Sequence, residues 1–221
     1  MTKVTEPQAS TLNKNKKVFI VGPTFGVQQE FREYGYDVFF DRDYSADPKR
    51  VLEETDFICF MGGTDISPKL YGQQRLSITQ NPDTRRDTHE IALYHLFKEK
   101  NKLGICRGAQ LLNVLQGGSM FQHVDKHCDG NHLVVDNSGS YHQVCSVHHQ
   151  LIKPSAGAEL VSWAVESTYR IDDAGEYPSD GVDPEVLFHE KDKALMFQAH
   201  PEFGPPNCTN YFFNLIEQRF L

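Results

Sequence analysis

Cys106 is the residue of this chain most plainly placed to act as a nucleophile. It stands within Gly104-Ile105-Cys106-Arg107-Gly108, which has the Gly-x-Ser-x-Gly spacing of a nucleophile elbow with sulfur in place of oxygen. In such an elbow a strand turns sharply into a helix, and the two glycines leave room where backbone meets backbone. The unpaired amides and the dipole of a helix N-terminus favour the thiolate form of a cysteine. The pattern predicts nucleophilic catalysis by Cys106, with the Arg107 N–H as one oxyanion donor.

A single cysteine is more often a small core residue than a nucleophile, so the hypothesis requires a base. His200-Pro201-Glu202 directly follows the apolar segment 194–198, which we expect to be a buried strand. Side chains two residues apart lie on the same face of an extended chain. Glu202 can therefore hold the His200 imidazole in one tautomer while His200 faces the thiol, which is the arrangement of a nucleophile–base–orienter triad.

The elements around these residues predict an α/β fold. Apolar runs predict strands over 17–22, 36–40 and 56–61, with helices over 28–34 and from Asp47-Pro48 onward. Strands separated by helices indicate a parallel sheet covered by helices on both faces. Gly62-Gly63 follows the third strand, at the edge where open α/β sheets bind ligands. A tight turn without a ligand remains an alternative for these two glycines.

Further elements are predicted on either side of the elbow. Asp87 and Glu90 have the spacing of a capping box, and we expect a helix from there to about Asn101, with both carboxylates in structural roles. After the elbow, leucines at helical spacing predict a helix that ends at Gly117-Gly118. The chain then becomes strand-rich and closes with a helix; the expected strands are 119–124, 132–135, 143–147, 159–165 and 186–188, and the helix is 207–220.

Composition excludes several classes of protein. The chain has 221 residues and a formal net charge of −8, which argues against nucleic acid or an anionic membrane as the main partner. No apolar run has the length of a membrane span. Five scattered cysteines are typical of a reducing compartment, so we expect a cytoplasmic protein. Residues 1–16 are polar and are predicted to be a disordered tail, with one domain over residues 17–221.

The motifs resemble those of a known superfamily. The segments 104–110, 117–118 and 198–202 are similar to the signatures of class I glutamine amidotransferase-like proteins. The segments 62–72, 86–87 and 113–114 resemble the γ-glutamyl hydrolase-like branch, which includes γ-glutamyl-γ-aminobutyrate hydrolases. The resemblance covers about residues 18–221, and its motifs occur in the family's order.

The resemblance implies a flavodoxin-like three-layer α/β/α fold, with a mostly parallel central sheet and an added β-rich segment. It implies a Cys–His–Glu triad at Cys106, His200 and Glu202, and no cofactor. The oxyanion donors would be the backbone amides of Gly63 and Arg107. The substrate-binding residues would be Gly62, Asp65, Gln110, His148 and His149. Two positions depart from the family's pattern, Ala199 where Trp is frequent and His123 where an acidic residue is frequent, and both concern the substrate pocket.

Three functions are compatible with the sequence. The first is a stand-alone hydrolase of γ-glutamyl amides, acting on a small-molecule γ-glutamyl substrate. The second is a glutaminase module that delivers ammonia to a synthetase partner. The third is a non-catalytic protein whose His123, His127, Cys128 and His132 have the spacing of a zinc set. Because solvated loop histidines are commoner than metal ligands, no metal is expected.

Overall fold

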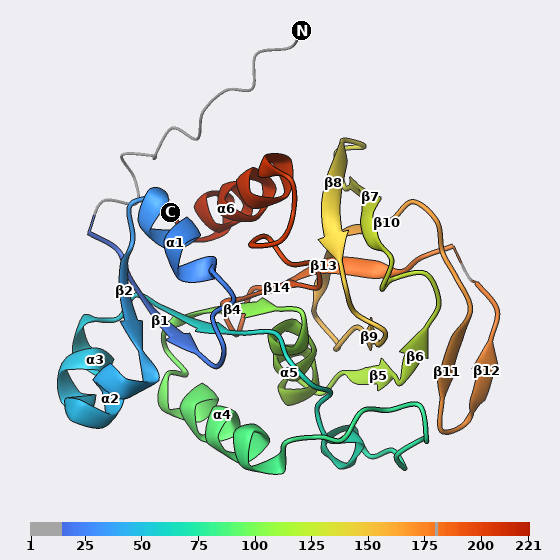
Figure 1. Cartoon of the computed structure of the whole chain (residues 1–221), viewed down its shortest axis with the longest axis horizontal. Helices are drawn as coiled ribbons and strands as arrows, with labels where there is room; N and C mark the ends of the chain where they lie inside the picture. Colours follow the sequence, from blue (N-terminus) through green and yellow to red (C-terminus); the bar gives the residue numbers. More distant parts are fainter. Residues whose placement is uncertain (1–14, 180) are drawn as a thin grey trace, which may run out of the picture.

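A nine-stranded sheet forms the centre of the computed structural model, which describes residues 15–179 and 181–221. One half is parallel, in the order β2 (Asp37–Phe40), β1 (Lys17–Val21), β3 (Phe57–Phe60), β4 (Asn101–Ile105) and β14 (Ala194–Phe197). The antiparallel half continues from β14 with β13 (Pro184–His189), β10 (Glu159–Ala164), β7 (Gly130–Asp136) and β8 (Tyr141–Ser146). The expected α/β fold, with a β-rich addition to a parallel sheet, is confirmed (Figure 1).

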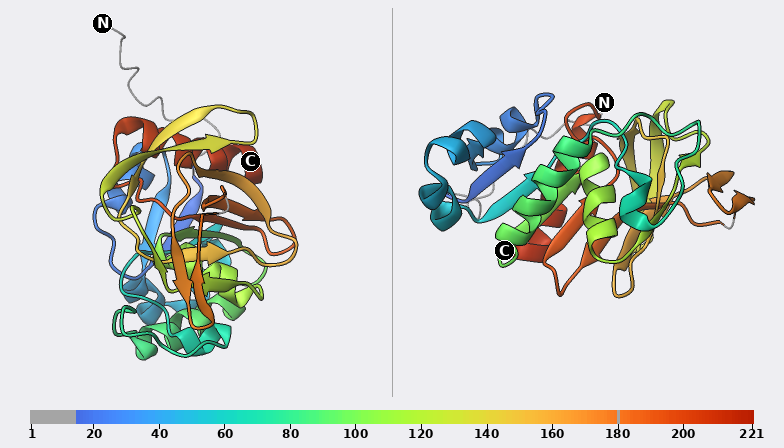
Figure 2. Two further views of the ribbon diagram at one scale, coloured as in Figure 1. Left: turned by 90° about the vertical axis from the view of Figure 1, so that its right-hand side faces the viewer. Right: turned by 90° about the horizontal axis from the view of Figure 1, so that it is seen from below.

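Helices cover both faces of the parallel half (Figures 1 and 2). One face packs against α1 (Val27–Glu33) and α6 (Pro206–Phe220); the other packs against α3 (Pro48–Glu54), α4 (Thr84–Leu96) and α5 (Arg107–Leu115), with α2 (Asp41–Ala46) beside them. Alternate residues of β1 separate the two cores. Val18 and Ile20 belong to the cluster with α1 and α6, whereas Phe19 and Val21 belong to the other. This period of two is the signature of a strand buried on both faces, and it produces the predicted three layers.

The short strands outside the main sheet form two smaller sheets. β5 (Ser119–Phe121) pairs with β9 (Leu151–Lys153), while β6 (His123–Val124) pairs with β11 (Arg170–Asp172), which also pairs with β12 (Gly175–Tyr177). The single strand expected over 119–124 is thus divided, because the chain changes partner at Gln122. The β11–β12 hairpin projects from the end of the molecule far from α2 and α3 (Figure 2).

The start of α4 differs from the prediction. Its N-cap is Asp83, whose carboxylate accepts hydrogen bonds from the N–H groups two and three residues later, both at 3.1 Å. The capping box expected at Asp87 and Glu90 is therefore wrong, and both residues lie inside the helix. The helix ends at Leu96 rather than near Asn101, because Asn101 already pairs with β3 as the first residue of β4.

The predicted tail falls mostly outside the described residues, which begin at residue 15. Lys16 already belongs to the fold, since its carbonyl oxygen accepts a hydrogen bond from the N–H of Asp37 (2.9 Å). Within the described ranges, every helix is too short or too polar to cross a membrane.

Candidate active site

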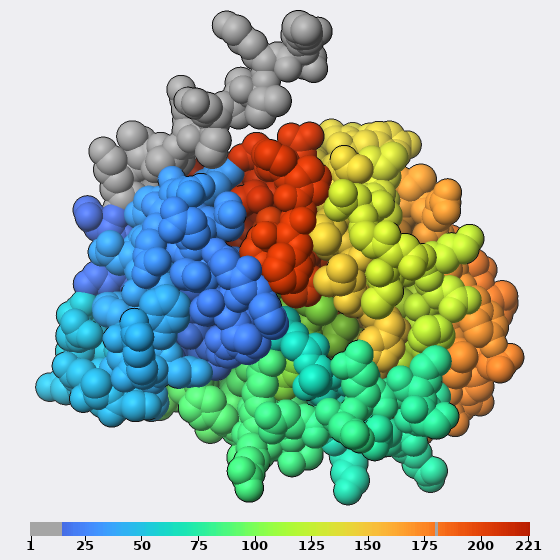
Figure 3. Space-filling model, in the orientation of Figure 1, coloured from blue at the N-terminus to red at the C-terminus, as the bar shows by residue number. Residues whose placement is uncertain are grey.

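Three neighbouring parallel strands bring the predicted site residues to one edge of the sheet. β4 lies between β3 and β14, with Gly104 beside Phe60 and Ile105 beside Phe197. The residues that follow these strands therefore meet at the carboxyl edge. The segments after β1, β14 and β8 adjoin one another on the face drawn in Figure 3, and the N–H of His200 donates to the carbonyl of Cys145 in β8 (2.9 Å).

Cys106 occupies the turn between β4 and α5, as the elbow pattern predicts. Its backbone has φ 51° and ψ −108°, a left-handed conformation that is uncommon for a residue with a side chain. A Cβ on Gly104 would lie 2.6 Å from the backbone nitrogen of Ala109, and one on Gly108 would lie 1.9 Å from the carbonyl oxygen of Phe60. Both flanking glycines are thus required by the close approach of α5 to β3 and β4.

His200 lies between Cys106 and Glu202. Its Nδ1 is 2.9 Å from Oε1 of Glu202, whose side chain is fully buried. Burial alone would lower the pKa of His200, but hydrogen bonds with Cys106 and Glu202, together with their charges, raise it to about 10. The imidazole is accordingly protonated at neutral pH, and a neighbouring cation favours the thiolate of a cysteine.

Gly62, the first of the two glycines after β3, lies against this pair. A Cβ on Gly62 would be 2.6 Å from Cε1 of His200 and 3.6 Å from Cβ of Cys106. Gly63 has φ 147°, which lies in the region that favours glycine. Only residues without a side chain allow the loop to approach Cys106 and His200 this closely, which is the condition for a backbone oxyanion donor near the thiol.

A buried ion-pair network, which the sequence reasoning missed, connects that loop to the elbow. Arg86 donates to the carbonyls of residues 61–62 (2.7 and 2.9 Å) and to Oε1 of Glu90 (2.7 Å). Arg107 donates to the other oxygen of Glu90 and to Oδ1 of Asp87 (2.5 Å). Glu90 therefore bridges the two segments expected to supply oxyanion donors. The four-residue spacing of Arg86 and Glu90 on a helix was the available signal for one of these pairs.

Three of the predicted substrate-binding side chains remain near the edge of the sheet. Asp65 has Oδ1 3.0 Å from Nε2 of His149, and its Oδ2 accepts the N–H of Gln80 (2.8 Å). Gln110 is buried in the first turn of α5, and its N–H donates to the carbonyl of Cys106 (3.1 Å). Asp65 thus holds His149, while Gln110 lies one helical turn after Cys106.

His148 and the suggested zinc set are arranged differently. His148 has Nδ1 2.8 Å from a backbone carbonyl and Nε2 3.3 Å from Oε1 of Glu185, so both of its ring nitrogens face the buried interior. His123 lies 3.0 Å from an exposed carboxylate and Cys128 is exposed. The four-residue zinc set is therefore wrong as a group, because only His127 and His132 come together, and they do so at Glu185.

Two aromatic rings border His200. Phe203 stacks on His200 with ring centroids 5.0 Å apart, and Phe25 lies 5.8 Å from Phe203. Each phenylalanine is 49% exposed. They form an apolar border between His200 and solvent, which no sequence motif had indicated.

Comparison with known proteins agrees with the geometry. Residues 38–173 match the family described as Peptidase C26. The glutamine amidotransferase-like protein YvdE of Lactococcus lactis subsp. lactis is 30% identical over 195 residues, 78% of this chain and 77% of that protein. Its homologue from subsp. cremoris is 34% identical over 146 residues, 56% of this chain and 78% of that protein. A glutamine amidotransferase structure from Thermotoga maritima has a TM-score of 0.58 at 18% identity, covering 92% of this chain and 85% of its own, which shows the same fold.

Proposed function

This chain belongs to the peptidase C26 family, of the class I glutamine amidotransferase-like type, and from that premise we propose that it hydrolyses γ-glutamyl amide bonds. One observation carries the proposal. Cys106 stands in a strained elbow at the start of a helix, beside a buried imidazole whose other nitrogen is held by Glu202. Such an arrangement combines an activated nucleophile with a proton donor for the leaving amine.

The first half of the reaction forms a thioester. The Cys106 thiolate attacks the side-chain carbonyl carbon of the γ-glutamyl group, and the carbonyl oxygen becomes an oxyanion. The backbone N–H groups of Gly63 and Arg107 stabilise that charge, each contributing about 10²–10³ to the rate. His200 then transfers its proton to the amine nitrogen, the C–N bond breaks, and the amine leaves.

The second half releases glutamate. With the amine gone, the neutral imidazole of His200 takes a proton from a water molecule as that water attacks the thioester carbonyl. The same two amides stabilise the second oxyanion. Collapse of this intermediate breaks the C–S bond, restores the thiolate and leaves His200 protonated, so the proton balance closes. Glu202 orients the ring throughout.

Polar residues beside the thiol are suited to the glutamyl head group. We assign Gln110 and His149 to contacts with its polar groups, with Gly62 and Gly63 against the scissile amide. Asp65 has both oxygens engaged, so it acts by holding His149 in place. The aromatic border of Phe25 and Phe203 favours a leaving amine with an apolar portion.

A second candidate is a glutaminase module that passes ammonia to a synthetase partner. It is favoured by the names of the relatives, which describe glutamine amidotransferase-like proteins. The two candidates share the same thioester chemistry and differ in the leaving group, an alkylamine in one case and ammonia in the other. They differ also in whether the isolated chain turns over its substrate without a partner.

The test is a product assay on the purified full chain without any partner. Glutamine and γ-glutamyl-γ-aminobutyrate would be offered separately, with release of glutamate followed for both. We expect turnover of the γ-glutamyl amine by the chain alone, and trapping of a glutamyl thioester on Cys106 by acid quench and mass spectrometry.

Two results would contradict the hydrolase. Turnover of glutamine only, and only after a synthetase is added, would favour the glutaminase module. A chain that forms no thioester with either substrate would indicate a non-catalytic protein. Asp37→Asn, on the far end of the sheet in β2, serves as a matched control for handling and folding.

A further inference from the structure

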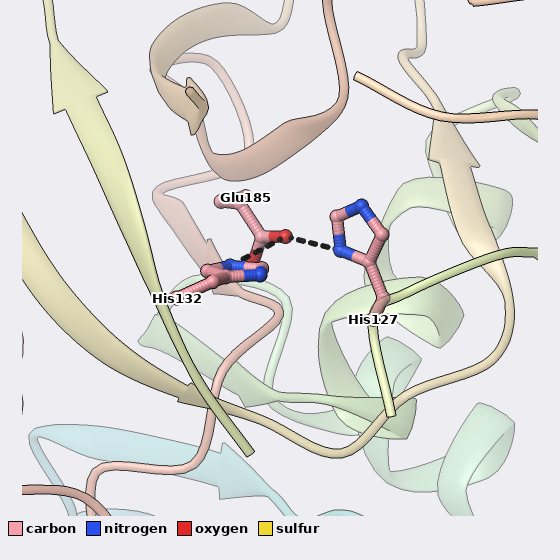
Figure 4. A group of neighbouring side chains, drawn as sticks. All are labelled: His127, His132 and Glu185. Carbon is pink, nitrogen blue, oxygen red and sulfur yellow. Dashed lines mark ion pairs between the residues drawn. The ribbon is translucent and has the colours of Figure 1, made fainter. Parts of the chain in front are cut away.

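We propose that His127, His132 and Glu185 form a buried structural zinc site in the antiparallel half of the sheet. The ligand atoms of the three residues lie within 4.8 Å of one another. Figure 4 shows both imidazole rings facing the carboxylate of Glu185. None of these residues is used in the proposed reaction, so the inference is independent of it.

Three imidazole nitrogens converge on one carboxylate oxygen. Oε1 of Glu185 is 2.9 Å from Nδ1 of His127, 3.3 Å from Nε2 of His132 and 3.3 Å from Nε2 of His148. Ligand bonds of about 2.0–2.1 Å at tetrahedral angles place neighbouring ligand atoms about 3.3 Å apart. The distances from Glu185 to His127 and His132 are therefore compatible with a cation that all three residues share.

The same atoms contact one another without good hydrogen-bond geometry. Oε1 of Glu185 forms ion pairs with both rings, but both carboxylate oxygens, Nδ1 of His127 and Nε2 of His132 are buried without a hydrogen bond of acceptable geometry. Buried polar atoms are rarely left unpaired, since each costs roughly 1–3 kcal/mol. Unpaired atoms that all point into one small volume indicate a ligand common to them.

The far side of the His127 ring is held in the manner of a metal-bound histidine. Its Nε2 is 2.9 Å from Oδ2 of Asp183. A carboxylate or carbonyl on the remote nitrogen sets the tautomer that leaves the near nitrogen free to bind a metal. Asp183 is itself held by Ser167, Thr168 and Arg170.

Charge also favours a divalent cation. Glu185 and Asp183 are both buried carboxylates, and Arg170 pairs with Asp183. Among the described residues, the ion-pair partners of Glu185 are all histidines. A buried carboxylate is costly unless a cation is near. A zinc ion bound by neutral histidines would supply positive charge at Glu185, and imidazole with carboxylate is a donor set that zinc accepts.

The position of the site indicates a structural role. His132 is in β7, Glu185 is in β13 and His127 is in the loop before β7, so the ion would join three segments. The backbone N–H of Gln198, two residues before His200, donates to the carbonyl of Glu185 (2.8 Å). The ion would thereby stiffen the strand that carries the catalytic histidine. His132 also lines a surface cavity of about 350 Å³, which gives the ion access.

The experiment begins with the metal content of the full chain, purified without an affinity tag that binds metals. Elemental analysis for zinc and the other first-row metals should find one zinc per chain. Chelation followed by added zinc at about one hundred times its dissociation constant should raise Tm by about 5–10 °C. The chelated protein loaded with Co²⁺ should show the intense visible bands of a tetrahedral site.

Matched variants locate the ion. Glu185→Gln and His132→Ala should lose the zinc and the cobalt bands, and His132 is partly exposed, so its variant removes little core. His123→Ala and Cys128→Ser should keep both, because neither residue reaches the cluster. Cys106→Ala should also keep the zinc, which separates this site from adventitious binding at the thiol.

Several results would overturn the proposal. One is a chain without bound metal whose Tm does not respond to added zinc, in which a protonated His127 bridges Asp183 and Glu185. Another is zinc content that persists in both Glu185→Gln and His132→Ala. A different ion at one per chain would overturn the assignment to zinc. Each result concerns metal content and stability, so failure of the proposed hydrolase activity would not produce it.

Discussion

Two buried clusters of ionisable side chains lie on opposite halves of the same sheet, and they are built in different ways. The cluster at Cys106 lies at the carboxyl ends of parallel strands, beside a helix N-terminus and two glycines that remove steric barriers. The cluster at Glu185 lies among antiparallel strands and the loops near their ends, without a helix. The first has a strained backbone at its centre, whereas the second has three imidazole nitrogens around one carboxylate oxygen.

The difference shows how the two kinds of sheet create chemistry. In the parallel half, every strand ends at the same edge, so the pairing of neighbouring strands is enough to bring the short motifs after them together. In the antiparallel half, a cluster requires single residues from several strands and loops to meet. The candidate catalytic residues therefore lie at the carboxyl edge of the parallel strands. The residues proposed to join segments of the chain through a metal lie in the antiparallel part. The predictions below test that separation.

The largest effect is expected from removing the nucleophile. Cys106→Ala should lower kcat/KM by about 10⁴-fold or more, because removal of a nucleophile leaves only binding and the oxyanion amides. Steady-state assays with a γ-glutamyl amide measure this. The variant should keep its Tm within a few degrees, since little apolar volume is removed. Full activity in Cys106→Ala would place the chemistry elsewhere.

The next effect concerns the orienting carboxylate. Glu202→Gln should lower kcat by about 10²–10⁴, and should move the alkaline limb of the pH profile to lower pH. Glu202 helps raise the pKa of His200 from its ordinary 6.5 to about 10, and the protonated form is the acid that the reaction needs. Profiles of kcat/KM against pH for both proteins measure the shift, which belongs to the coupled thiol–imidazole pair.

The same pKa makes a prediction about stability. Because the pKa of His200 is higher in the fold than in the unfolded chain, its contribution is fully present below pH 6.5 and is lost as pH rises through about 10. Urea unfolding of the parent should show this decline, and Glu202→Gln should show a smaller one. An identical alkaline decline in the two proteins would contradict the assignment to His200.

A smaller effect on rate is expected from the bridge between the oxyanion segments. Glu90→Gln should reduce kcat by about 10–10², since a displacement of about 1 Å is costly to catalysis. It should also cost about 3 kcal/mol of unfolding free energy, because it weakens two buried guanidinium contacts. The matched control is Glu53→Gln in the exposed Lys49 pair, which should cost less than about 1 kcal/mol. Equal losses of kcat and of unfolding free energy in the two variants would contradict a positioning role for Glu90.

The smallest effect on activity should come from the antiparallel cluster. Chelation should lower Tm by several degrees, yet change kcat less than about threefold when assayed well below Tm, since a structural zinc touches no reacting atom. Activity and melting measured on the same chelated sample check this. A loss of activity as large as that of Cys106→Ala, without unfolding, would mean that the two clusters are not separate in function.

Local sequence was sufficient wherever a single segment supplied the constraint. The Gly104–Gly108 spacing predicted the elbow, and the apolar runs predicted the strands of the parallel half. Where two distant segments had to meet, local patterns misled. Asp87 and Glu90 have the spacing of a capping box, but both bind Arg107. The buried guanidinium of Arg107 needs carboxylate partners, whereas the start of the helix is already capped by another residue.

The sequence by itself determined the family, the elbow and the pairing of His200 with Glu202, because each depends on residues a few positions apart. Only the tertiary structure decided which histidines gather. His123 and Cys128 share a segment with His127 and His132 but lie apart from them, His123 against Asp125 and Cys128 in solvent. Glu185 and His148 arrive from other segments. The physical reason is that the register of the antiparallel strands selects the residues that meet. That register depends on pairings between distant segments, so it cannot be read from any short stretch of sequence.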